Sequence, residues 1–565
     1  MKLNCIPYLL LLVFLTVVSS RAQEVVPPLD IPLKLSGTFG EFRPTHFHAG
    51  LDIKTQGKEG FEVKSIDAGS IRRIRVTTTG YGKALYIEHA NGTTSVYAHL
   101  KKFAPKIQAL IKTYQYEKKT FVIQKFLSLG ELTVEKGELI GYSGNTGGSM
   151  GPHLHFEIRD TKKETPLNPL QLDLAISDSI RPIVQGLYLY DINDKRLGEK
   201  AVVPLTRKND SVYTTEVLSL GGNKAFGVRL FDRQDNSYNR NGVYKAELKV
   251  NGVPAFGYTF NSIDFKDGKK IDALIDYATY KNDRIRIQKL FNNLEADYSF
   301  LDKNDPDGIL SFEADRAYQL VFQFKDFSGN STYIKLFISG IEETKTPPIA
   351  SAKEKLLLPE KDYLFEDGPY TLYIPKQSFY QPTGIAFKVA GDTLNLETDD
   401  APQKKGFDLT FRHPELDSLG YQQMCLAKFI AGKGKKKDRW SYVPMLKKDS
   451  HLRTQYAYPG QYIFTRDSLA PSIVPKNFRK EQWVSNYQFL EVEIEDDFSG
   501  IARSEARING EWILMEHEPK NNTLTFDFDD LKATQARLEF KLIVKDQVGN
   551  TALFETNLFR KPKTR

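Results

Sequence analysis

The chain has 565 residues, of which 40% are hydrophobic and 26% are charged, and its formal net charge is +7. This length is too great for one hydrophobic core and predicts about three to five domains. The aromatic content of 12% excludes a disordered chain. Basic and acidic residues are mixed throughout, so the small positive excess permits attraction to anionic polymers but does not indicate nucleic-acid binding.

The N-terminal segment 1–22 has the pattern of a signal peptide. Lys2 precedes an apolar run over residues 6–18, and small residues at 20–22 favour cleavage before Gln23. The apolar run is short for a membrane span, and an uncleaved anchor is the alternative. We therefore expect an exported protein with no stable membrane span after cleavage, located in the periplasm, in the cell envelope or outside the cell.

The next unit, residues 23–177, is rich in short alternating runs, which predict an antiparallel β domain. Segments 84–89 and 94–99 have the pattern of strands, and Asn91-Gly92 between them is a strong hairpin signal. An insert at 104–127 interrupts this pattern. Its apolar residues fit either a helix or an irregular segment.

After residue 177, short strands and turns dominate, and the sequence repeats weakly. Four landmarks recur in the same order and suggest two copies of one β-sandwich. The landmarks are segment 178–184 and its counterpart 467–474, an acidic turn at Asp232 and at Asp496-Asp497, an Asn-Gly turn at 251–252 and at 509–510, and an Asp-rich glycine turn at 326–330 and at 546–550.

These landmarks divide the rest of the chain into three β units. We predict a β-sandwich at 178–341 with an insertion at about 253–316, a β-rich unit at 342–467, and an immunoglobulin-like sandwich at 468–565. The Asp-rich turns could bind calcium through oxygen atoms, although such clusters more often form simple turns. We interpret the three units as spacers, or as docking modules for envelope proteins.

Histidines gather in the first β unit. Five of the nine lie in or beside three short segments, 48–52, 97–100 and 151–156. They are His46, His48, His99, His153 and His155. Such clustering in one domain is not typical of a random surface.

The pair His153 and His155 has apolar neighbours that predict a strand, and residues two apart on a strand face the same way. Catalytic zinc usually keeps three protein ligands and one open position, where it lowers the pKa of a water to about 7. One histidine of the pair, with His48 and Asp52, would complete such a set. The other stays free to move a proton, and His99 could stabilise the developing oxyanion.

These segments resemble the lysostaphin-type zinc endopeptidases, also called LytM-domain proteins, over about residues 37–169. Four further segments carry the resemblance. They are Gly37-Thr38-Phe39-Gly40, Gly80-Tyr81-Gly82, Lys136-Gly137-Glu138-Leu139-Ile140-Gly141 and Gly144-Asn145-Thr146-Gly147. The resemblance implies a small, mostly antiparallel β domain with a groove, whose usual substrate is the peptide part of peptidoglycan.

The resemblance also implies a role for each site residue. His48, Asp52 and His155 would ligate zinc, His153 would be the general base, and His99 would assist it or bind the oxyanion. His46 and His89 are not part of this set, and we interpret them as a surface residue and a strand-end residue.

The sequence therefore predicts an exported zinc metalloendopeptidase that hydrolyses peptide bonds of bacterial peptidoglycan. Two alternatives stay open: a non-catalytic LytM-like regulator or scaffold of another cell-wall hydrolase, and a peptidase that acts on envelope proteins. The presence of every expected site residue disfavours the regulator. The insert at 104–127 departs from the family pattern, and it either borders or blocks the groove or is a surface insertion without a role.

Overall fold

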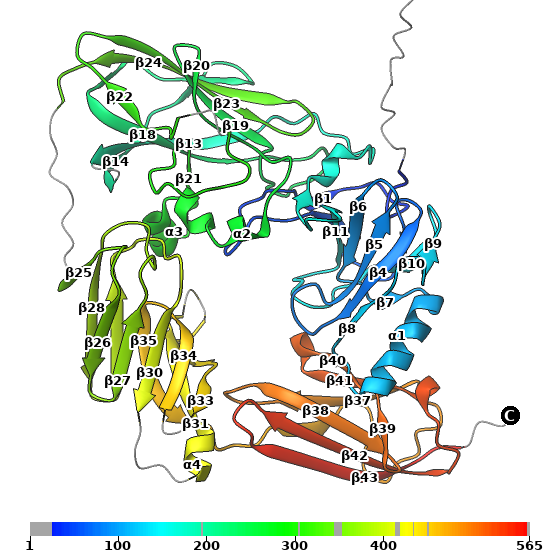
Figure 1. The fold of residues 1–565 in the computed structure, drawn as a ribbon. Coiled ribbons are helices and arrows are strands. Elements are labelled where there is room, and N and C mark those ends of the chain that lie inside the picture. Colours follow the sequence, from blue (N-terminus) through cyan, green and yellow to red (C-terminus); the bar gives the residue numbers. More distant parts are fainter. Residues whose placement is uncertain are drawn as a thin grey trace, which may run out of the picture.

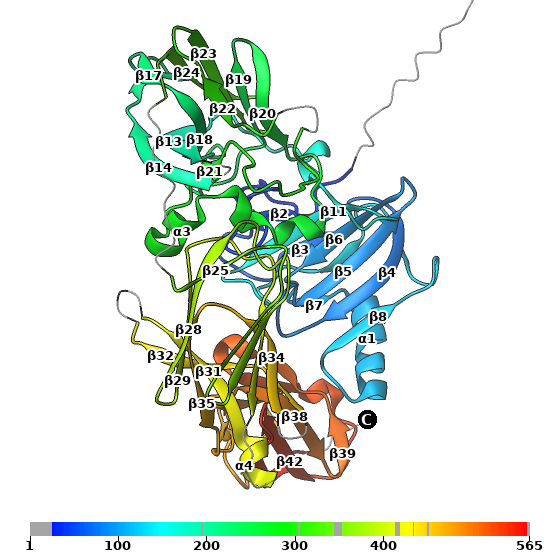
Figure 2. The ribbon, with the colours of Figure 1, turned by 60° about the vertical axis from the view of Figure 1, so that its left-hand side comes forward.

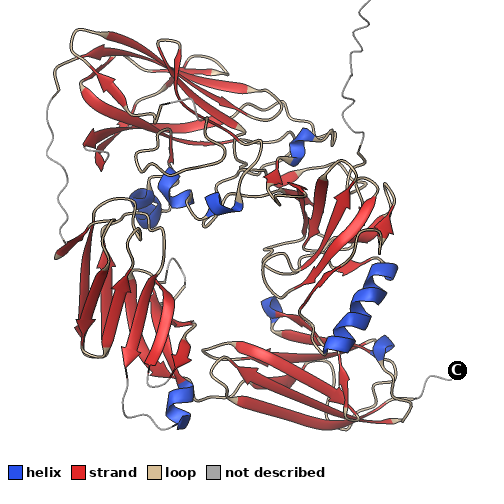
Figure 3. Cartoon of the chain, viewed as in Figure 1, coloured by secondary structure: helices blue, strands red, loops and turns tan. Residues whose placement is uncertain are grey.

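The computed structural model describes residues 25–561, except for 194–195, 303–305, 344–352, 413–417, 433, 435 and 449–450. The signal peptide predicted for residues 1–22 lies outside the described residues. The architecture is mainly β, as predicted, and the described residues form four β units (Figure 3). Among them, no helix is long and apolar enough to cross a membrane.

The first unit is built on one large antiparallel sheet. Its strands are β1 (Leu35–Gly37), β2 (Leu51–Lys54), β4 (Gly69–Val76), β5 (Lys83–His89), β6 (Thr93–Ala98), β8 (Ile123–Phe126), β9 (Thr133–Val134), β11 (His153–Asp160) and β12 (Pro166–Leu167). Their order is β1-β2-β11-β6-β5-β4-β8, with β12 on β11 and β9 on β4. A smaller sheet has the order β3-β10-β7 and comprises β3 (Glu62–Lys64), β10 (Leu139–Tyr142) and β7 (Lys102–Phe103). A short 3-10 helix, η1 (Pro169–Gln171), ends the unit.

The hairpin predicted at Asn91-Gly92 is present between β5 and β6. Gly92 has a φ of 80°, a left-handed conformation that glycine adopts without strain. The strand predicted at 94–99 ends one residue early, because His99 has a φ of 60° and leaves the strand geometry. This change of direction carries His99 out of the sheet ladder at the end of β6.

The insert at 104–127 contains the helix α1 (Pro105–Lys118). Pro105 occupies the first helical position, where its missing N–H costs nothing. Ile107, Ile111 and Gln115 are buried at intervals of four residues, so one face of the helix packs against the domain. Lys119 then ends the helix in a left-handed conformation, with a φ of 50°.

The second unit consists of two sheets. One has the order β14-β13-β18-β21, with β22 on β18; the other has the order β15-β16-β24-β23-β19-β20, with β17 on β24. The strands are β13 (Ile183–Asn193), β14 (Arg196–Val203), β15 (Thr206–Arg207), β16 (Val212–Thr214), β17 (Leu218–Leu220), β18 (Gly222–Phe231), β19 (Lys245–Val250), β20 (Val253–Thr259), β21 (Gln288–Lys289), β22 (Leu310–Phe312), β23 (Ala317–Lys325) and β24 (Ser331–Gly340). The short helices α2 (Phe265–Gly268), η2 (Ile271–Leu274) and α3 (Tyr277–Asp283) lie between β20 and β21.

The third unit also has two sheets, with the orders β25-β28-β29-β35-β31-β32 and β26-β27-β30-β34-β33. The strands are β25 (Lys355–Leu357), β26 (Tyr363–Asp367), β27 (Tyr370–Ile374), β28 (Thr383–Ala390), β29 (Thr393–Thr398), β30 (Phe407–Arg412), β31 (Met424–Ile430), β32 (Arg439–Val443), β33 (Leu446–Lys448), β34 (His451–Ala457) and β35 (Gly460–Arg466). The helix α4 (Ser418–Gln423) precedes β31. The two sheets share one hydrophobic core.

The fourth unit has the sheets β36-β37-β41-β40 and β39-β38-β42-β43 around a core of its own. The strands are β36 (Ser472–Pro475), β37 (Phe489–Glu495), β38 (Ile501–Ile508), β39 (Glu511–Ile513), β40 (Glu516–Glu518), β41 (Thr523–Asp527), β42 (Arg537–Asp546) and β43 (Thr551–Phe559). Two 3-10 helices, η3 (Pro519–Asn521) and η4 (Phe528–Asp530), flank β41.

The sequence landmarks of the repeat lie at corresponding places in the second and fourth units. The turn Asn251-Gly252 joins β19 to β20, as Asn509-Gly510 joins β38 to β39. The turn 326–330 joins β23 to β24, as 546–550 joins β42 to β43. In both units the strand after the acidic turn pairs with the strand before the Asp-rich turn. The repeat therefore reflects one shared strand pairing.

The fourth unit lies beside α1 of the first unit (Figures 1 and 2). The Tyr116 ring meets the Trp512 ring edge to face, with centroids 5.3 Å apart. Lys112 Nζ lies 2.5 Å from Asp530 Oδ1, and Lys83 Nζ lies 2.7 Å from Glu516 Oε2. The insert is therefore a contact surface for the last sandwich.

Candidate metal centre

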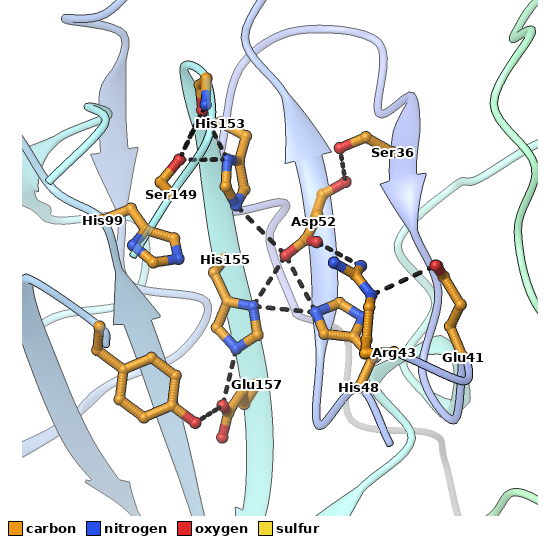
Figure 4. Close-up of polar contacts among 12 residues, drawn as sticks. Ser36, Glu41, Arg43, His48, Asp52, His99, Ser149, His153, His155 and Glu157 are labelled. Atoms are coloured by element: carbon orange, nitrogen blue, oxygen red, sulfur yellow. Dashed lines mark hydrogen bonds and ion pairs between the residues drawn. The ribbon is translucent and has the colours of Figure 1, made fainter. Parts of the chain in front are cut away.

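Three side chains predicted as metal ligands converge on one point of the large sheet (Figure 4). Asp52 on β2 is paired in register with His155 on β11, and His48 lies just before β2. His155 Nδ1 lies 2.9 Å from Asp52 Oδ1, and His48 Nε2 lies 3.1 Å from the same oxygen. The two ring nitrogens are 3.2 Å apart. All three residues are buried.

In each histidine of the predicted ligand set, the ring nitrogen that faces away from the other ligands has a hydrogen-bond partner. This partner decides which nitrogen of the neutral ring carries the proton. His48 Nδ1–H donates to the Thr38 carbonyl oxygen at 2.9 Å, since a carbonyl can only accept. His155 Nε2–H donates to Glu157 Oε1 at 2.7 Å. In the neutral rings, His48 Nε2 and His155 Nδ1 then present lone pairs to each other and to a carboxylate. Such a set of converging donor atoms can hold a cation, and two imidazoles with one carboxylate suit zinc.

Asp52 uses its two oxygens differently. Oδ1 faces the histidines, whereas Oδ2 accepts a hydrogen bond from Arg43 Nη2 at 2.8 Å. Burial raises the pKa of Asp52, but His48, His153 and His155 outweigh it and hold the pKa well below its usual range. Arg43 thus leaves one oxygen of an ionised carboxylate for a metal.

The buried Glu157 carboxylate accepts a hydrogen bond from the ring nitrogen of His155 that faces away from Asp52. Glu157 lies two residues further along β11, and its Oε2 pairs with Arg159 Nη2 at 2.6 Å. The Tyr81 hydroxyl donates to the other oxygen of this carboxylate. Burial raises the pKa of Glu157, but Arg159, His155 and Tyr81 lower it to about 2. Burial lowers the pKa of His155, but hydrogen bonds to Asp52 and Glu157 raise it to about 9.

His153 stands beside the ligand set on the same face of β11 (Figure 4). Its Nδ1–H donates to the Gly151 carbonyl oxygen at 2.9 Å, and Ser149 Oγ lies 3.1 Å from the same nitrogen. Nε2 therefore carries the lone pair, and it lies 3.4 Å from Asp52 Oδ1. This orientation suits a group that takes a proton at the metal centre.

His99 faces His153, with ring centroids 4.8 Å apart. Its Nδ1–H donates to the Thr146 carbonyl oxygen at 2.8 Å. Burial and the neighbouring histidines lower the pKa of His99 to about 3, so its ring is neutral and Nε2 is an acceptor. Of the two roles predicted for His99, assistance to His153 fits this tautomer better than donation to an oxyanion.

The two histidines left out of the predicted site are not among the three converging side chains. His89 Nε2 contacts Ser95 Oγ at 2.7 Å, and its Nδ1 contacts the Ala68 carbonyl oxygen, so it links neighbouring strand ends. His46 is exposed, with its Nδ1 near Thr45 Oγ1.

The loop that carries His48 is anchored by the second unit. The Phe47 ring packs against Phe300, with centroids 5.0 Å apart, and against Phe260 at 6.1 Å. The Gly242 N–H donates to Thr38 Oγ1 at 3.1 Å. Because the Thr38 carbonyl oxygen also accepts from His48, the first sandwich helps to position a predicted metal ligand.

Glu157→Gln is expected to weaken metal binding by about 10–100-fold, because the neutral amide no longer strengthens His155 as a donor to the metal. The affinity can be measured by competition with a chromogenic zinc chelator. Tyr81→Phe, which keeps the carboxylate, is the matched control and should change the affinity less. An unchanged affinity in the glutamine variant would show that Glu157 does not act on the metal centre.

Residues 46–116 and 114–169 match the model of peptidase family M23. The DD-carboxypeptidase/endopeptidase Mpg of Neisseria meningitidis is 33% identical over 127 residues, which is 22% of this chain and 23% of that protein. An uncharacterized metalloprotease of Haemophilus influenzae is 31% identical over 159 residues, which is 28% of this chain and 27% of that protein. The chain spans about a quarter of the length of these curated relatives.

Solved structures also match part of the chain. The catalytic domain of lysostaphin from Staphylococcus simulans is 24% identical, with a TM-score of 0.18, and the match covers 24% of this chain and 86% of that one. A zinc containing peptidase from Vibrio cholerae is 25% identical, with a TM-score of 0.20, over 26% of this chain and 39% of that one. By the family match, the first β unit of this chain is a domain of peptidase family M23, the lysostaphin-type family that its motifs predicted.

Proposed function

We propose that this protein is an exported zinc metalloendopeptidase that hydrolyses peptide bonds of bacterial peptidoglycan. The observation that carries the proposal is the convergence of His48 Nε2, Asp52 Oδ1 and His155 Nδ1 within 3.2 Å of one another, inside an M23 domain. Zinc, when bound there, supplies Lewis acidity that polarises a peptide carbonyl and activates water.

The residues of the chain supply the rest of the chemistry. His153 Nε2, held in its basic tautomer by Gly151, accepts the proton of the attacking water and later returns it to the leaving amine. The His99 ring lies tilted against the His153 ring, with centroids 4.8 Å apart, and helps to hold it in place. Arg43 holds Asp52, and Glu157 holds His155, each through one hydrogen bond.

Two features support a cell-wall substrate. The curated relative Mpg is named a DD-carboxypeptidase/endopeptidase. The N-terminal segment 1–22 has the pattern of a signal peptide, which would bring the protein to the compartment that holds peptidoglycan. The intact ligand set favours an enzyme over a non-catalytic regulator of another hydrolase.

The test is mass spectrometry of purified cross-linked muropeptides after incubation with zinc-loaded residues 23–565. We expect zinc-dependent loss of the cross-linked species, and the masses of the products identify the bond that is cut. Uncross-linked muropeptides and an unfolded protein such as casein are incubated in parallel.

His46→Ala is the matched control, because this histidine is exposed and lies outside the ligand set. It should cleave like the unaltered protein. Cleavage of casein without cleavage of muropeptides would replace the cell-wall substrate with a protein substrate. No cleavage of any substrate, despite bound zinc, would favour the regulator.

A further inference from the structure

Two groups of three aspartates lie outside the metal centre, in the second and fourth units. In the second unit, carboxylate oxygens of Asp178, Asp232 and Asp326 lie within 4.8 Å of one another. In the fourth unit, oxygens of Asp467, Asp496 and Asp546 are gathered within the same limit. We call these groups the first and second aspartate triads.

The two triads occupy the same place in the repeated fold. Their first members lie on the segment that enters the sandwich, ahead of β13 in one unit and of β36 in the other. Their second members directly follow β18 and β37. Their third members lie at the end of β23 and of β42, in the Asp-rich turn. Two copies of one arrangement are harder to explain by chance than one acidic cluster.

The entering segment is tied to the Asp-rich turn in the same way in both units. Asn330 Nδ2 donates to the Asp178 carbonyl oxygen at 3.0 Å and to Asp326 Oδ2 at 2.8 Å. Asn550 Nδ2 donates to the Asp467 carbonyl oxygen at 2.9 Å. These bonds hold the backbone in place but leave carboxylate oxygens pointing at one another.

One buried oxygen of the first triad and one beside it lack a hydrogen-bond partner among the described residues. Asp232 is 3% exposed, and its Oδ1 is unpartnered. The Oδ1 of Asn241, which is 4% exposed and lines the same cavity as the triad, is also unpartnered. In the second triad, Asp496 Oδ1 is buried without a partner. An unpartnered buried carboxylate oxygen is costly, so the first triad calls for a cation, and the second triad repeats its arrangement around the half-buried Asp496.

The pKa values of two aspartates in the first triad agree with a cation site. Burial, followed by repulsion from Asp178 and Asp326, raises the pKa of Asp232 to about 9. Burial is also the main cause that raises the pKa of Asp178, to about 7. Both raised pKa values agree with carboxylates that are gathered in one partly buried site.

We propose that each aspartate triad binds a calcium ion, which fastens the entering segment to the sandwich that follows it. The donors are all oxygen atoms, which suits a hard cation rather than zinc. Oxygens separated by up to 4.8 Å can share one ion when each bond is about 2.4 Å long, the length typical of calcium, whereas magnesium needs a smaller cage. In the first site, Asn241 Oδ1 would be a fourth donor.

Calcium would then fix two junctions of the chain. Asp178 follows the M23 domain directly, and Asp467 follows β35 of the third unit. The fourth unit also contacts α1 and Lys83 of the first unit. Calcium bound at these two junctions would restrict movement between neighbouring units and so help to keep the fourth unit against α1. The proposal does not depend on the peptidase activity.

The test is equilibrium dialysis of residues 23–565 against calcium chloride, after removal of divalent ions, with thermal unfolding measured alongside. We expect two bound calcium ions, with dissociation constants on the order of 10⁻⁴–10⁻³ M, as in extracellular calcium modules. Asp232→Asn and Asp496→Asn should each lose one ion, and the double variant should lose both.

Thermal unfolding separates a binding site from a merely structural aspartate. Without calcium, Asp232→Asn should unfold at the same or a higher temperature than the unaltered protein, because the neutral amide avoids the burial cost and the repulsion that raise the pKa of Asp232. With calcium, only the unaltered protein should gain stability at that site. Asp497→Asn is the matched control, because Asp497 is exposed beside Asp496 and should leave both ions bound.

Three results would overturn the proposal. The first is the absence of calcium binding up to about 10 mM. The second is retention of both ions by the double variant. The third is complete displacement of calcium by an equal concentration of magnesium, which would assign the sites to the smaller ion.

Discussion

His155→Ala is expected to abolish stoichiometric zinc binding and to lower peptide hydrolysis by about 10³-fold or more. His155 contributes one of three converging donor atoms, and its Nδ1 lies 2.9 Å from Asp52 Oδ1. Its loss leaves two donors, too few for the three protein ligands of a catalytic zinc site. Metal content by mass spectrometry and muropeptide cleavage measure the two effects.

This variant also removes a partner of the buried Glu157, which keeps Arg159 and Tyr81. Circular dichroism should therefore show an intact β fold. His46→Ala, a histidine change near the same motif, should keep both metal and activity. A His155→Ala protein that binds one zinc and cleaves normally would exclude His155 as a ligand.

His153→Ala is expected to retain zinc while hydrolysis falls by about 10²–10⁴-fold. His153 Nε2 faces the metal centre 3.4 Å from Asp52 Oδ1, but the three ligand atoms are complete without it. Measuring metal content and cleavage rate on the same sample separates a proton-transfer residue from a ligand.

Ser149→Ala is the companion variant, because Ser149 Oγ lies 3.1 Å from His153 Nδ1 and contacts none of the three ligands. It should lower hydrolysis less than His153→Ala and leave zinc unchanged. Loss of zinc from His153→Ala would instead place His153 among the ligands, and unchanged hydrolysis would remove it from the reaction.

The sequence predicted which residues meet at the site because the rules involved are local. Alternation along a strand places His153 and His155 on one face. In the structure both lie on β11, and both side chains point toward Asp52 (Figure 4). The spacing of His48 and Asp52 identifies the other two ligand types. The structure brings these residues together with His99, while their roles as ligands and base stay predictions.

The same alternation, continued by two and four residues, leads to Glu157 and Arg159, which the sequence analysis missed. An acidic residue two positions after a strand histidine, between the apolar Phe156 and Ile158, was the available signal. Arg43 and Tyr81 gave no such signal. Arg43 reaches Asp52 through a loop, and Tyr81 reaches Glu157 from another strand connection.

Contacts between units were beyond sequence reasoning, because they join residues far apart in the chain. Phe47 packs on Phe300, and Tyr116 packs on Trp512. The insert was expected either to border or block the groove or to have no role, and its contact with the last sandwich was not foreseen. The internal repeat, in contrast, was visible because its turns carry Asn-Gly and Asp-rich signatures.

The most direct test of the metal centre is diffraction from zinc-loaded crystals at wavelengths on both sides of the zinc absorption edge. We predict an anomalous peak bonded to His48 Nε2, Asp52 Oδ1 and His155 Nδ1, at about 2.0–2.2 Å from each. A fully loaded crystal with no peak among these atoms, or with zinc held by other residues instead, would contradict it.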